Sequence, residues 1–186
     1  MPISLTSPNV DNYYVGKGIV SVKFTDSSQG PTDDDYVDMG NVTSMSFTPK
    51  ITKLDHFSSR QGIKKKDLSV ATVLEAEIKM VAEEFTARNI QMALLASFSE
   101  SPSGSNENVV LDIFTEPLRK CAFKFVGTNS VGPQWTFEFP VVVLTPTGAL
   151  DTISDEWGKI ELTGDVLADP NTGLFGTASC TFPASP

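Results

Sequence analysis

The chain has 186 residues, a formal net charge of −9 and a mean hydropathy of −0.06. This length favours one domain with a sizeable core, which we expect to span residues 1–186. No apolar run approaches the roughly 18 residues of a membrane span, and the N-terminus lacks the basic and apolar regions of a secretion signal. We therefore expect the chain to be made in the cytoplasm and not to associate with a membrane. The acidic charge disfavours tight nucleic-acid binding as the main task.

Alternation of apolar and polar residues predicts strands along most of the chain. The pattern is clearest at residues 20–24, 45–47, 74–80, 123–125, 135–139 and 160–162. Each of these segments has one apolar and one polar face, which is typical of antiparallel sheets with one face in water. Trp135 is in phase with Phe137 and Phe139, and we expect all three in the core.

Residues 82–96 are rich in helix formers and contain no Gly or Pro, so they predict a helix with Phe85 on its buried face. The Ser- and Gly-rich residues 97–108 predict an exposed loop, and residues 165–186 predict an extended segment lying over the fold. Many strands with a single helix indicate a mainly β fold. We expect an antiparallel β-sandwich or barrel with one flanking α-helix and a long hairpin loop.

The sequence signals neither catalysis nor a bound cofactor. The acidic run at residues 33–38 lacks the alternating ligands and closing Glu of a calcium-binding loop, and we interpret it as a solvated turn. Cys121 and Cys180 are the only cysteines and His56 is the only histidine, too few for a structural zinc site. No nucleophile elbow accompanies His56. We therefore expect no enzyme activity, no cofactor and no metal site.

One basic segment stands out in this acidic chain. Residues 50–80 carry seven basic and four acidic side chains, a net charge of +3. Its centre, residues 60–67, joins two strand-like stretches, residues 41–57 and 68–80. Three interpretations remain open: a nucleic-acid contact, a solvated hairpin tip, or an arm that docks onto an acidic copy of the same chain. The candidate contact residues are Leu54, Phe57, Arg60, Gln61, Gly62, Ile63, Lys64, Lys65, Lys66 and Asp67.

Three stretches together resemble the tail tube proteins of siphophages. Residues 54–67 resemble the long loop between rings, residues 80–94 the strand-then-helix unit, and residues 155–166 the closing strand with its turn. The resemblance implies a virion structural protein that assembles into rings, expected to be hexameric, which stack into the tail tube for genome ejection.

The resemblance also implies a set of partners. These are other copies of the chain, the tape measure, terminator and distal tail proteins, and DNA that passes through without specific binding. The alternatives are a secretion-system tube protein, which shares the ring architecture, and a β-sandwich binding module such as a carbohydrate-binding domain. A carbohydrate-binding module would expose an aromatic platform, for which Trp157 is the candidate.

Overall fold

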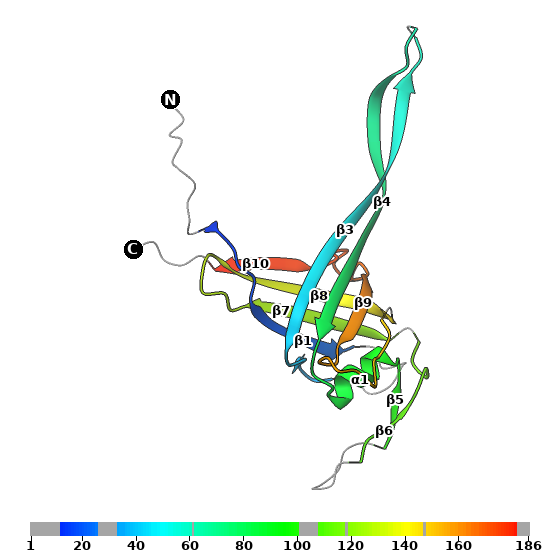
Figure 1. Cartoon of the computed structure of the whole chain (residues 1–186). Coiled ribbons are helices and arrows are strands. Elements are labelled where there is room, and N and C mark those ends of the chain that lie inside the picture. Colours follow the sequence, from blue (N-terminus) through cyan, green and yellow to red (C-terminus); the bar gives the residue numbers. More distant parts are fainter. Residues whose placement is uncertain are drawn as a thin grey trace.

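The protein is mainly antiparallel β-structure with one short α-helix in its described part (Figure 1). The computed structural model describes residues 12–25, 33–60, 62–100, 108–117, 119–146 and 148–181. The strands are β1 (Gly18–Phe24), β2 (Val37–Asp38), β3 (Val42–Ser58), β4 (Lys65–Ala82), β5 (Ser97–Glu100), β6 (Val110–Asp112), β7 (Lys120–Gly127), β8 (Gln134–Pro146), β9 (Ile160–Val166) and β10 (Thr177–Thr181), and the helix is α1 (Ala87–Ala93).

Eight strands form one open sheet, in the order β2-β1-β7-β8-β9-β4-β3, and β10 pairs with β8 beside this path. Every pairing in the sheet is antiparallel. The long strand β8 pairs with β10 through its first half and with β9 through its second half. Strands β5 and β6 form a separate hairpin. The prediction of a mainly antiparallel β fold with one helix is therefore confirmed.

The core lies on the apolar face of the sheet. The fully buried side chains come from alternating positions, as in Val20, Val22 and Phe24 of β1 and Ile78 and Met80 of β4. Alternate residues of a strand point to opposite faces, so this spacing collects the apolar side chains on one side. Phe47 of β3 stacks on Phe139 of β8 with 5.0 Å between ring centroids, so β3 packs back across the sheet.

The helix is shorter than the sequence predicted. It begins after Thr86, whose hydroxyl accepts a hydrogen bond from the Asn89 backbone N–H, and it ends at Ala93. Ala82 belongs to β4, and Phe85, predicted on the buried face of the helix, is exposed. Glu84 is not a helix residue, because its carboxylate accepts a hydrogen bond from the Asn41 backbone N–H. Residues 83–86, predicted as part of the helix, are therefore held outside it by tertiary contacts.

Two other segments are more regular than we expected. Part of the predicted loop at residues 97–108 forms β5, which pairs with β6, while residues 101–107 lie outside the described residues. In the predicted extended segment 165–186, two residues complete β9, and residues 177–181 form β10 against β8. Residues 182–186 lie outside the description. Neither short strand carries an apolar alternation that would have revealed it.

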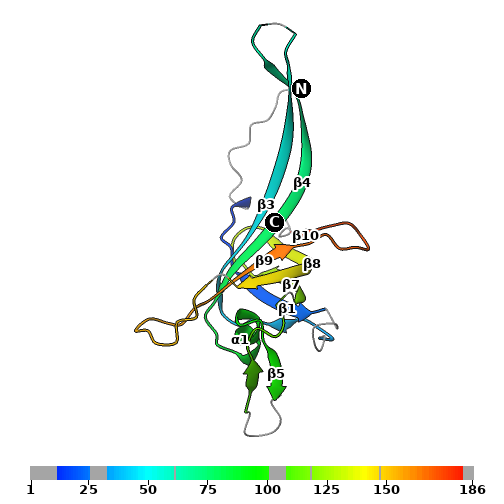
Figure 2. The same cartoon turned by 90° about the vertical axis from the view of Figure 1, so that its right-hand side faces the viewer.

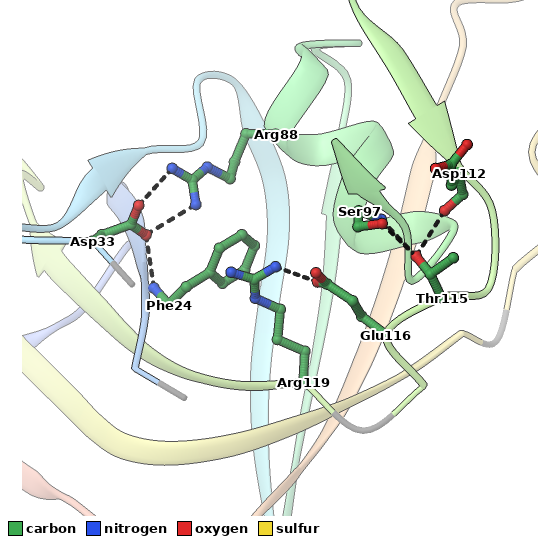
Figure 3. A network of polar contacts seen from close by, with 8 residues as sticks. All are labelled: Phe24, Asp33, Arg88, Ser97, Asp112, Thr115, Glu116 and Arg119. Atoms are coloured by element: carbon green, nitrogen blue, oxygen red, sulfur yellow. Dashed lines mark hydrogen bonds and ion pairs between the residues drawn. The ribbon is translucent and has the colours of Figure 1, made fainter. Parts of the chain in front are cut away.

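A polar network joins α1 to β1 (Figure 3). Arg88 of α1 donates two hydrogen bonds to Asp33, at 2.9 and 2.7 Å, and Asp33 also accepts one from the Phe24 backbone N–H at 2.7 Å. The Phe24 ring contacts the guanidinium groups of Arg88 and Arg119, and Arg119 forms a buried ion pair with Glu116. Asp33, predicted as part of a solvated acidic turn, is therefore a structural residue instead.

Strands β3 and β4 extend far beyond the sheet as a two-stranded arm (Figures 1 and 2). We define the arm as residues 49–60 and 62–75. Its side chains are exposed, apart from the half-buried Ser58. The predicted strand-like stretches at 41–57 and 68–80 match β3 and β4 closely. None of the described helical structure is long and apolar enough to cross a membrane.

Candidate interaction surfaces

Nine of the ten predicted contact residues lie along the arm or at its tip. Leu54 and Phe57 belong to β3, and Lys65, Lys66 and Asp67 belong to β4. Between the strands lie Arg60, Gly62, Ile63 and Lys64, while Gln61 falls outside the described residues. Gly62 has a φ of +44°, a backbone conformation that favours glycine at a reversal of the chain. The structure thus brings the predicted segment together as one projecting element.

The two faces of the arm differ in chemistry. Side chains of directly opposed residues lie on the same face of an antiparallel pair. Leu54 opposes Val70, and His56 opposes Leu68, so these residues share one face, with Thr52 and Val73 next along it. This face, which we call the apolar face of the arm, was only partly identified from sequence. The sequence pattern did not show which face of β4 carries Leu68, Val70 and Val73.

The opposite face carries an ordered polar cluster. Lys66 Nζ lies 2.7 Å from Asp55 Oδ2, and the Ser69 hydroxyl donates a 2.6 Å hydrogen bond to Asp55 Oδ1. The hydrogen bonds from Lys66 and Ser69 hold the pKa of Asp55 below its ordinary value. Phe57 opposes Lys66 on this face, so Leu54 and Phe57 do not form one apolar site.

The apolar side chains of β3 change faces along its length. Near the sheet they occupy odd positions, with Met45, Phe47 and Ile51 on the face that continues the core. Beyond Thr52 the even-numbered Leu54 takes over, while odd-numbered positions become polar at residues 53 and 55. The change coincides with a β-bulge between Thr52 and Lys53. Leu54 therefore lies on the opposite face of β3 from Met45, Phe47 and Ile51.

Two bulge residues of β4 bond back to β3. Thr72 faces no partner in the register, and its hydroxyl donates a 3.2 Å hydrogen bond to the Thr52 carbonyl. Asp67 is the extra residue of the second bulge, and its Oδ1 lies 2.6 Å from His56 Nδ1. His56 is therefore held by Asp67 within the arm.

Positive charge at the arm tip is largely unpaired. Arg60, Lys64 and Lys65 form no ion pair with any residue in the described part of the chain, whereas Lys66 is held by Asp55. Ile63 at the tip is 83% exposed. An exposed apolar residue among unpaired cations suits a partner surface that is both apolar and acidic.

An aromatic hollow lies where β3 crosses β7 and β8. Its volume is about 320 Å³, and it is lined by Tyr14, Met45, Phe47, Phe125, Phe137 and Phe139. Phe137 is half-buried, as is Trp135, which stacks beside it at 5.9 Å. Phe139 is buried as predicted and Phe137 packs against the core, whereas Trp135, also predicted in the core, is half-buried outside it. Sequence alternation identified their face correctly, but it could not show that this end of the face is uncovered.

A second hollow, which we call the Trp157 hollow, lies beside the strand-to-helix connection. It is lined by Glu83, Ser154, Asp155, Glu156, Trp157 and Lys159. Trp157 is 89% exposed, which agrees with its interpretation as an exposed aromatic residue. A Cβ atom at Gly158 would lie 2.6 Å from the Phe85 ring, so the chain passes directly against that ring. This close approach fixes the loop beside Trp157.

No arrangement in the described residues resembles a metal centre. No three or more His, Cys, Asp or Glu side chains there are grouped so that they could hold an ion. Cys121 is buried, and this burial raises the pKa of its thiol far above the ordinary value, so the thiol stays protonated at neutral pH.

The fold and these surfaces define a class of protein: a mainly antiparallel β protein whose open sheet carries a projecting two-stranded arm. The chain belongs to the family described as "Protein of unknown function UCP028589", which matches residues 13–111 and 104–178. The match includes the whole arm and nearly all of the sheet. A comparison with curated proteins finds no match.

Proposed function

We propose that this chain is a structural subunit of a phage tail tube, which assembles into hexameric rings that stack around a channel for DNA. The subunit would act by self-assembly, without catalysis or a cofactor. The observation that carries the proposal is the arm, which exposes apolar side chains on both faces and has an excess of positive charge at its tip. The resemblance of the sequence to siphophage tail tube proteins points to the same role.

The apolar side chains of such an arm stay in water unless a partner covers them. An isolated two-stranded hairpin is at best marginally stable in water, because it has no third layer to cover its apolar side chains. Leu54 is 68% exposed and Leu68 57% exposed, and Val70 lies beside them on the same face. A subunit of a stacked tube would bury this apolar face against a neighbour.

Open sheet edges also favour assembly. In the described part of the chain, β3 pairs with β4 on one side only, and its other edge is free. A long free edge is a template for pairing with another chain. Strand β10, which pairs with the same edge of β8 as β9 does, offers a second edge. Contacts between unlike edges of neighbouring subunits are heterologous and close into rings when the rotation fits. Such a ring would complete the barrel that the sequence predicts.

The charge of the chain suits a conduit for DNA. A net charge of −9 allows an acidic channel wall, which repels phosphates and lets the duplex slide. The basic residues concentrate in the arm, where they would be occupied by contacts between subunits. The tape measure, terminator and distal tail proteins would then be the other partners of the subunit, and the mature location would be the virion tail.

Electron microscopy of the purified chain tests the proposal. We expect negative-stain images of concentrated protein to show rings or hollow tubes, and size-exclusion chromatography with light scattering to show species heavier than the monomer. Reversing the charges of Lys64, Lys65 and Lys66 together should reduce stacking while leaving the melting temperature unchanged. Filaments without a channel, or tubes unaffected by that reversal, would contradict the proposed role of the arm.

A β-rich binding module is the second candidate, favoured by the aromatic hollow. Exposed rings such as Phe47 and Tyr14 resemble the platforms on which sugar rings stack. A soluble monomer that is retained on a glycan column, and is released when Phe47 is replaced by Ala, would favour this function. A secretion-system tube protein would share the ring geometry and would be distinguished by its substrate.

A further inference from the structure

We infer that the Trp157 hollow receives the arm tip of a second copy of this chain. The inference rests on the proposed self-assembly and adds the receiving site, which nothing in the sequence pattern indicated. The two surfaces are complementary in charge, and each exposes one large apolar side chain. Ile63 of the tip and Trp157 of the hollow are the apolar partners.

The hollow is negatively charged, whereas the tip is positively charged. Glu83, Asp155 and Glu156 contribute three carboxylates to its wall, and Lys159 contributes one ammonium group. Glu83 accepts a 2.8 Å hydrogen bond from the Asn41 side chain, whereas Asp155 and Glu156 form no ion pair within the described residues. The hollow therefore carries a net negative charge that other described side chains leave available.

The arm tip has matching groups and a suitable size. Arg60, Lys64 and Lys65 are unpaired cations, and Ile63 is the exposed apolar residue among them. A hollow of about 660 Å³ has room for several side chains of a hairpin tip. An arginine over the face of Trp157 would add a cation–π contact to the ion pairs. Salt should weaken such a contact because most of its groups remain near water.

The positions of the two surfaces require that the contact be made between molecules. The tip lies at one end of the molecule, and α1 lies at the other (Figures 1 and 2). The Trp157 hollow is at the α1 end, because Glu83 precedes α1 in the chain and Phe85 packs against Gly158. A tip that binds the hollow of the next copy generates a head-to-tail contact. Such contacts repeat along an axis and stack subunits or rings.

Charge exchange tests the inference directly. One full-length variant reverses the tip (Lys64→Glu, Lys65→Glu), a second reverses the hollow (Asp155→Lys, Glu156→Lys), and a third combines all four changes. Self-association is measured by analytical ultracentrifugation at low and high salt. We expect each double variant to need at least tenfold more protein for half-association at low salt. For the variant with all four changes, the protein concentration for half-association should return to within about threefold of the wild-type value, because the exchanged charges attract each other again.

A matched control separates the hollow from the loop around it. The double variant Asp151→Lys, Glu161→Lys makes the same change in net charge at exposed positions outside the hollow, and Asp151 lies in the same loop. This control should associate within about twofold of wild type. The single variant Trp157→Ser should weaken association at least tenfold, with an unchanged melting temperature because Trp157 is exposed.

The outcomes distinguish this inference from the proposed function. Recovery of self-association in the variant with all four changes, with an unaffected control, supports the tip-to-hollow contact. Rings or tubes that respond to tip reversal but not to hollow reversal would overturn the inference and leave the proposed function standing. A wild-type chain that stays monomeric at every concentration tested would overturn the inference as well. Tubes that then form on a tail initiator would still support the proposed function.

Discussion

Removal of the arm should leave the rest of the fold intact. The register places Thr52 directly opposite Val73, so these two residues can be joined by a two-residue turn. We would replace residues 53–72 with Asn-Gly, the sequence that best suits a tight β-hairpin turn. This change removes the arm beyond its first bulge and retains the part of β3 and β4 that belongs to the sheet. No residue between 53 and 72 belongs to the hydrophobic core.

The magnitude follows from burial. Exposed side chains contribute little to the free energy of unfolding, and shortening a loop costs no closure entropy. We therefore expect that free energy to change by less than about 1 kcal/mol, which corresponds to about 4 °C or less in melting temperature for a chain of this size. Phe123→Ala is the matched core variant, since Phe123 is fully buried. It should cost about 3–5 kcal/mol, or roughly 6–20 °C.

The assay is thermal unfolding followed by circular dichroism, together with electron microscopy of concentrated samples. The variant without the arm should unfold cooperatively near the wild-type temperature and should form no tubes. A fall in melting temperature comparable to that of Phe123→Ala would refute the reasoning, since it would show that the arm is part of the folding unit. Normal tubes from the shortened chain would refute the role of the arm in assembly.

Three further predictions follow from individual contacts. Glu116→Gln removes the carboxylate from the buried ion pair with Arg119, and it should cost about 3–5 kcal/mol of unfolding free energy in urea titrations; an unchanged midpoint would contradict this. Because the folded pKa of Asp55 is lowered, its contact with Lys66 should be complete at neutral pH and lost only as the pH falls below the ordinary value of 3.8. A carboxyl titration followed by NMR, with a midpoint at or above 3.8, would contradict that. Leu54→Asp, on the apolar face of the arm, should weaken self-association at least tenfold with no change in melting temperature, as measured by sedimentation and calorimetry.

The long hairpin was the part of the fold most open to sequence reasoning. Alternation over many residues predicted both strands to within a few positions, because β-structure with one apolar face imposes a period of two. The basic segment between the strands marked the turn. The described candidate contact residues therefore lie together on one element, although the sequence did not show that Leu54 and Phe57 face opposite sides.

Elements that depend on tertiary contacts were less predictable. Local composition favoured a helix from Ala82, but Glu84 bonds to the backbone of Asn41, and Thr86 provides the cap that starts α1 later. Strand β10 has little apolar patterning, and its pairing with β8 defines it. Partners distant in sequence thus determined where each of these elements began, and a single sequence carries no direct record of them.

The bulges of β4 have a consequence for how the arm behaves before it meets a partner. A slip of one residue between two strands would send each side chain of the slipped strand to the opposite face, and the sheet core cannot prevent this so far from the body. Thr72 and Asp67 each bond across to β3 at a position that tolerates only one alignment. These two bonds within the arm therefore oppose a slip of one strand along the other. In the proposed assembly, a free subunit would already have its two arm strands correctly aligned, and docking would not require them to change their pairing.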